Sequence, residues 1–167
     1  MDLIPEAGDL VLAHSKDTFG KLIRFAQWLR PSWRPYKYWN HSALVVSNIN
    51  GEITCVQMGR RCVTVTLENV APGGVTQIRK CPEGVDRVKA LDYALRQVGV
   101  RYSYLTIVSI ALNLLTPKAF RINFRRNGTA LICSALCARS YEHGDWIIPD
   151  NSDPFQVTPC QLAMWVK

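Results

Sequence analysis

The chain has 167 residues, of which 48% are hydrophobic and 20% are charged. This length fits one domain with a sizeable core, which we expect to span residues 1–167. The composition excludes an intrinsically disordered chain, which would need low hydrophobicity and high charge. The net charge of +7 favours anionic partners such as phospholipid, nucleic acid or a cell-wall polymer. A well-solvated basic surface explains the charge equally well.

The N-terminus, the longest apolar run and the cysteine spacing indicate the localisation of the protein and the state of its thiols. The N-terminus lacks the basic start and apolar run of a signal peptide. The longest apolar run, residues 105–115, is too short to cross a bilayer. We therefore expect a cytoplasmic or peripheral membrane protein. The six cysteines include no Cys-x-x-Cys pair, so we expect free thiols, no metal site and no cofactor.

The first half of the chain predicts short strands and one helix. A strand at residues 8–13 is followed by a helix at 17–29, with Asp17 as its cap. Apolar runs then predict strands at 42–46, 53–58, 62–67 and 75–78. Successive short strands indicate an antiparallel sheet.

The second half is helical in pattern. Its apolar spacing predicts helices at residues 85–98, 105–115 and 131–143, and a last helical turn at 159–165. Strands followed by helices predict an α+β protein.

Residues 30–40 form a predicted loop in which basic residues alternate with aromatic ones. Such a mixture can bind a membrane interface or nucleic acid bases. The other interpretation is a loop whose rings cover the core while its cations stay in water.

Cys133 and His41 are the candidate reactive pair. The turn predicted at 127–130 would begin a helix with Cys133 in its first turn, where the helix dipole favours a thiolate. Buried cysteines are usually inert, so Cys133 needs further support. His41 opens a strand, where an imidazole can be held rigidly. His143, by contrast, lies at a predicted helix C-terminus, where a cation offsets the helix dipole. This structural role is enough to explain His143.

Five motifs occur in one order along nearly the whole chain. They are Gly8-Asp9 before a strand, Asn40-His41-Ser42 before the next, Gln57 on the strand after that, Val98-Gly99-Val100-Arg101-Tyr102, and Cys133-Ser134-Ala135-Leu136 with a late Thr158-Pro159. This order resembles the YiiX-like, circularly permuted branch of the papain-like NlpC superfamily, which is related to lecithin-retinol acyltransferase-like enzymes. The resemblance implies a permuted papain-like fold, with an antiparallel sheet packed against helices and the nucleophile on a late helix.

The resemblance also implies the roles of individual residues. Cys133 would be the nucleophile and His41 its base. Gln57 would accept the distal N–H of His41, although an outward-facing strand glutamine is the other interpretation. Tyr102 and Ser134 would contact substrate, with a buried structural ring as the alternative for Tyr102. The family's acidic residue after Cys-Ser is Ala135 here, and Gln57 replaces the commoner glutamate.

The expected chemistry is acyl transfer through a thioester on Cys133. The resemblance implies hydrolysis of an amide in a cell-wall peptide or of an acyl ester, in a bacterial or phage protein. A lipid acyltransferase or thioesterase at an anionic membrane surface is one alternative, and a non-catalytic binding domain is another. Nucleic acid is the least favoured partner.

Overall fold

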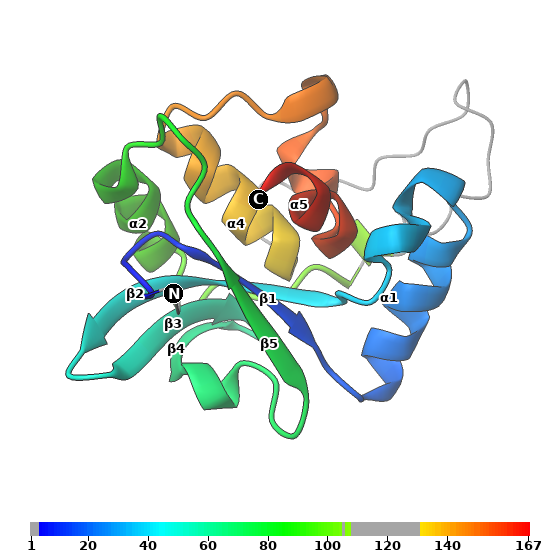
Figure 1. Ribbon diagram of the computed structural model, residues 1–167, viewed down its shortest axis with the longest axis horizontal. Helices are drawn as coiled ribbons and strands as arrows, with labels where there is room; N and C mark the ends of the chain where they lie inside the picture. Colours follow the sequence, from blue (N-terminus) through cyan, green and yellow to red (C-terminus); the bar gives the residue numbers. More distant parts are fainter. Residues whose placement is uncertain (1–3, 105, 108–130) are drawn as a thin grey trace.

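A five-stranded antiparallel sheet is the centre of the molecule (Figure 1). The computed structural model describes residues 4–104, 106–107 and 131–167. The strand order is β4-β3-β2-β1-β5. The strands are β1 (Leu10–His14), β2 (His41–Ile49), β3 (Glu52–Met58), β4 (Cys62–Thr66) and β5 (Val75–Arg79). The predicted α+β class with an antiparallel sheet is confirmed.

Helices cover one face of this sheet. In Figure 1, α2, α4 and α5 lie on one side of the strands, and α1 flanks the end of the sheet. The α-helices are α1 (Thr18–Trp28), α2 (Arg87–Arg96), α4 (Cys133–His143) and α5 (Pro159–Trp165). Short 3-10 helices are η1 (Pro31–Tyr36), η2 (Leu67–Asn69), η4 (Pro149–Asn151) and η5 (Pro154–Gln156). None of the described helices is long and apolar enough to span a bilayer.

Three of the predicted segments have no described element of the same kind. The turn expected at 127–130 lies outside the described residues, and so does almost all of the helix expected at 105–115. The loop expected at 30–40 contains η1, because Pro31 stands at the first helical position, where its missing N–H costs nothing.

The core lies mainly between the sheet and the helices. Side chains alternate along β1, so Leu10 and Leu12 pack in the cluster that contains Leu136 and Tyr141 of α4. Val11 instead belongs to a smaller cluster of buried residues. Each fully buried leucine stabilises the fold by about 1.5–3 kcal/mol. This packing holds α4 firmly against the sheet.

Asp9 anchors the start of β1. Its carboxylate is fully buried and accepts from the Arg87 Nη1 at 3.0 Å and from the Cys81 backbone N–H at 3.0 Å. Lys80 lies 3.3 Å away on the other carboxylate oxygen. A buried charge is tolerated only when it is paired and hydrogen-bonded in this way. The Gly8-Asp9 motif therefore ties β1 to α2 and to the end of β5.

Candidate active site

The start of α4 places Cys133. Ile132 is the extended N-cap residue, and Cys133 is the first residue of the helix. The N–H groups of a first helical turn have no intrahelical partners and, with the helix dipole, favour a negative charge. Leu131 is held in a parallel bridge with Tyr102, and its carbonyl accepts from the Ser103 N–H at 2.9 Å. The backbone that leads into Cys133 is therefore fixed.

His41 and Gln57 come from neighbouring strands. His41 begins β2, and Gln57 on β3 stands opposite Ala43. Residues two apart along a strand share a face, so His41 and Gln57 are diagonal neighbours on one face. The His41 Nε2 lies 2.6 Å from the Gln57 Oε1, which confirms the predicted contact.

This contact sets the tautomer of His41. The Gln57 amide nitrogen donates to the Asn69 carbonyl at 3.4 Å, which orients the amide oxygen toward the imidazole. Because that oxygen only accepts, the His41 Nε2 carries a proton, and Nδ1 is the ring nitrogen that remains available to the thiol. Cys133 and His41 line the same cavity and interact strongly enough to shift each other's pKa, as expected for a thiol and an imidazole within reach of each other.

The two groups favour each other's charged forms. Burial by itself raises the pKa of the Cys133 thiol, but the charge and hydrogen bond of His41 outweigh it and hold that pKa below its ordinary value. Backbone N–H groups of Ser42 and Ser134 add to this effect. Burial lowers the pKa of His41, yet Cys133 and then Gln57 hold it above its ordinary value. The pair therefore tends toward thiolate and imidazolium.

The other five cysteines behave differently. All six are buried free thiols, as expected for a chain without disulfides. Burial raises the pKa of the Cys62 and Cys81 thiols to about 11, and that of Cys55 and Cys160 to about 12. Burial also raises the pKa of Cys137, one turn along α4. Cys133 is the one cysteine whose pKa is lowered.

A cavity of about 740 Å³ opens at the pair. Cys133, His41 and Gln57 line it, with the mixed polar and apolar surroundings typical of a substrate site. Asp17 also lines it and contributes to the raised pKa of His41, besides capping α1 through the Gly20 N–H. Lys16 and Arg60 are the other lysine, arginine or acidic residues in the described part of its lining.

Tyr102 and Ser134 have different positions. Tyr102 lines the cavity, and burial above all holds the pKa of its phenol far above the usual range, so the hydroxyl stays protonated. The Ser134 side chain does not line the cavity, contrary to the expectation that it contacts substrate. It is fully buried, and its hydroxyl donates to the Val157 carbonyl at 2.5 Å. Only its backbone N–H reaches the site, at Cys133.

Sequence reasoning missed the support that Asn40 provides. This buried side chain accepts from the Ser15 N–H and donates to the Ser15 carbonyl, both at 2.9 Å, next to His41. Gly20 allows the close approach, because a Cβ there would lie 2.5 Å from the Asn40 Nδ2. A glycine inside a predicted helix and an asparagine just before the histidine were the available signals. The contribution of the Ser42 backbone N–H to the site could not be read from the sequence, because it does not depend on the type of side chain.

Comparisons with known proteins support the fold alone. No family model matches the sequence, and no curated protein matches it. Among solved structures, the chain resembles yiiX from Escherichia coli O157:H7, described as a metalloprotein of DUF1105. The TM-score is 0.59 at 16% sequence identity, and the match covers 91% of this chain and 78% of that one. The chain therefore has a YiiX-like fold.

Proposed function

We propose that this protein is a cysteine-dependent hydrolase of the permuted papain-like NlpC type. The observation that supports it is the buried chain from Cys133 through His41 to Gln57, in which one thiol of six has a lowered pKa. A nucleophile, a base and a group that orients the base are the parts that thiol catalysis needs.

The first half of the reaction forms a thioester. The Cys133 thiolate attacks the substrate carbonyl carbon, and the carbonyl oxygen becomes an oxyanion. The unpaired N–H groups at the start of α4 stabilise that charge. As the intermediate collapses, the bond to the leaving group breaks, and imidazolium His41 gives its proton to the leaving amine or alcohol.

The second half releases the acyl group. A water molecule takes the place of the leaving group, and His41 removes its proton while the oxygen attacks the thioester. Collapse of the second intermediate frees the carboxylic acid and restores the thiolate beside a protonated His41. Gln57 keeps the imidazole oriented through both halves, and the Tyr102 hydroxyl would donate to substrate in the cavity.

A resident metal does not fit the site. The E. coli neighbour is described as a metalloprotein. Within residues 4–104, 106–107 and 131–167, no three histidine, cysteine or acidic side chains lie together as ligands. Asp17 caps α1, and His41 is bonded to Gln57 and Cys133. No step of the proposed reaction passes through a metal.

The substrate carries an amide or an acyl ester bond. A cell-wall peptide is the amide candidate, and a lipid or thioester is the acyl candidate. Both substrates form the same acyl-enzyme, and with an acceptor other than water the same site would act as an acyltransferase. The cavity offers cations for an anionic substrate group at Lys16 and Arg60.

Trapping the acyl-enzyme tests the proposal. The protein is incubated with cell-wall peptides and with acyl esters, and acylated peptides are identified by mass before and after neutral hydroxylamine. We expect the acyl group on Cys133, with release by hydroxylamine, and no product from Cys133→Ser. Cys160→Ser is the matched control, because Cys160 is also buried at a helix start but bonds to the Trp33 carbonyl. Turnover that survives in Cys133→Ser would refute the mechanism.

A further inference from the structure

A second feature of the molecule lies on α1 and η1, away from the reactive pair. Basic and aromatic side chains surround a concavity of about 440 Å³. We call this surface the aromatic–basic face. Its residues are Arg24, Phe25, Trp28, Arg34, Lys37 and Tyr38, with His14 and Pro35 completing the concavity.

The rings of this face are unusually exposed. Phe25 is 59% exposed, Trp28 43% and Tyr38 45%. Rings of this size normally bury most of their surface in a fold. Tyr36 and Trp39, which lie near Tyr38 within residues 30–40, instead pack against the core. The stretch at 30–40 therefore divides its rings between the core and the surface.

The cations of this face are held among the rings. The Arg34 guanidinium stacks 5.1 Å from the centre of the Trp28 ring, and its Nε donates to the Trp28 carbonyl at 3.2 Å. The Arg24 Nη1 donates to the His14 Nε2 at 2.6 Å, and the His14 ring stacks on Tyr38 at 4.1 Å. Among the residues that the structure describes, no acidic side chain lines the concavity.

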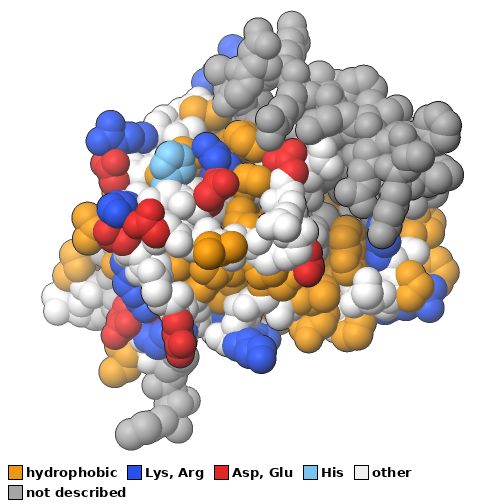
Figure 2. Space-filling view, turned by 90° about the horizontal axis from the view of Figure 1, so that it is seen from above, with side chains coloured by type: hydrophobic (Ala, Val, Ile, Leu, Met, Phe, Trp, Pro, Cys, Tyr) orange, Lys and Arg blue, Asp and Glu red, His pale blue; other side chains and the backbone are white. Residues whose placement is uncertain are grey.

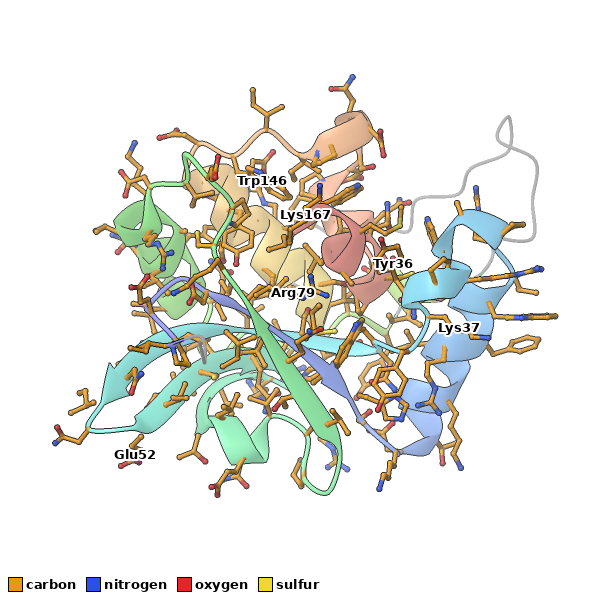
Figure 3. All side chains as sticks on the ribbon, viewed as in Figure 1. Tyr36, Lys37, Glu52, Arg79, Trp146 and Lys167 are labelled. Atoms are coloured by element: carbon orange, nitrogen blue, oxygen red, sulfur yellow. The ribbon has the colours of Figure 1, made fainter. Side chains whose placement is uncertain are left out.

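Figures 2 and 3 agree with an exposed aromatic–basic face on α1 and η1. Figure 3, in which Lys37 is labelled, shows side chains of α1 and η1 that point away from the sheet. At the right of Figure 2, on the side where Figure 1 places α1, hydrophobic and basic side chains lie next to one another.

We infer that the aromatic–basic face docks on the surface of an anionic phospholipid membrane. Exposed rings next to cations match both parts of a bilayer interface, because rings enter the headgroup boundary while cations meet the lipid phosphates. The described lining of the concavity carries cations and no acidic side chain, and with the net charge of +7 this supplies the charge complementarity. Nucleic acid fits less well, since the rings are gathered in one concavity rather than along a groove that follows a strand.

Docking would orient the molecule as well as attach it. Gly20 and Ile23 of α1 line the cavity of the reactive pair, while Arg24, Phe25 and Trp28 of the same helix line the aromatic–basic face. One helix therefore connects the docking surface to the cavity. The docking itself goes beyond the proposed cysteine chemistry and does not depend on it.

Co-sedimentation with vesicles tests the inference. The full chain is mixed with phosphatidylcholine vesicles that contain or lack phosphatidylserine, at low and at high salt. We expect binding to the anionic vesicles at low salt, weaker binding at high salt, and little binding to phosphatidylcholine alone. Arg34→Gln with Lys37→Gln should weaken binding about 25-fold, at about fivefold for each cation. Phe25→Ser should weaken binding at both salt concentrations.

Two controls separate docking from other effects. Lys89→Gln with Arg96→Gln removes the same charge from α2, at the other end of the molecule in Figure 1, and should leave binding nearly unchanged. Cys133→Ala should bind as the unaltered chain does, because the docking surface is separate from the thiol. The inference is overturned if the α2 control loses as much binding as the face variant, or if the protein ignores anionic vesicles at low salt. Binding to a single-stranded oligonucleotide without vesicle binding would assign the face to nucleic acid and also overturn it.

Discussion

Removing the imidazole should deactivate Cys133. In the intact protein, burial raises the pKa of the Cys133 thiol, and the charge and hydrogen bond of His41 outweigh that effect. In His41→Ala only the burial and the backbone N–H contributions from Ser42 and Ser134 remain. We therefore expect the pKa of Cys133 to rise above its ordinary value in this variant.

The size of the effect follows from the thiolate fraction. An ordinary cysteine with a pKa of about 8.5 is only about 3% thiolate at pH 7. A thiolate that is largely formed beside imidazolium would thus lose about thirtyfold in alkylation rate, even before burial adds its own penalty. This difference in rate disappears at high pH, where Cys133 is a thiolate in both proteins and their rates converge.

Alkylation by iodoacetamide measures this directly. The rate of modification of the Cys133 peptide is followed by mass spectrometry across pH, and a melting curve checks that each variant is folded. His143→Ala is the control, because His143 is exposed at the far end of α4 and stacks on Tyr93 at 4.1 Å. If His41→Ala and the intact protein have the same pH–rate profile, His41 does not activate the thiol and the reasoning fails.

Three further predictions follow from the same contacts. Gln57→Ala should lower kcat/KM by about ten- to hundredfold, because a hydrogen bond to charged imidazole is worth about 1.5–3 kcal/mol; an unchanged value in steady-state kinetics would contradict the orienting role. Near neutral pH, iodoacetamide should modify Cys133 before the other five cysteines, and equal labelling by peptide mapping would disprove its activation. Asp9→Ala should lower the free energy of unfolding by about 2–3 kcal/mol in urea titrations, because it leaves Arg87 partly buried without its carboxylate; a loss near zero would show that the pair is not structural.

The proposed reaction also predicts a bell-shaped pH dependence. Activity should rise with pH through the lowered pKa of Cys133, as the thiolate forms. It should fall again at higher pH, through the raised pKa of His41, as the imidazolium loses the proton that the leaving group needs. Gln57→Glu should move the falling limb to higher pH, because a carboxylate stabilises the imidazolium. A single-limbed profile of kcat/KM would argue against the ion pair.

Local patterns in the sequence determined much of the fold. The period-2 and helical spacings placed every described strand and α-helix within a few residues, because each element buries one face and its apolar residues must recur with the period of its backbone. The same patterns placed Cys133 near a helix start and His41 at a strand start, which are properties of near neighbours in the chain.

Only the tertiary structure decided which of these residues meet. Residues 41, 57 and 133 come from three elements, and the register of β2 with β3 and the packing of α4 bring them together. The tertiary structure also directs the Ser134 hydroxyl to the Val157 carbonyl. It leaves Cys137, four residues from Cys133, without an imidazole partner. Hydrogen bonding, burial and the charge of a thiol depend on atoms distant in the chain but a few ångströms away in space. For that reason the sequence pattern could nominate Cys133 as the nucleophile, and only the folded chain gave it an imidazole partner that Cys137 on the same helix lacks.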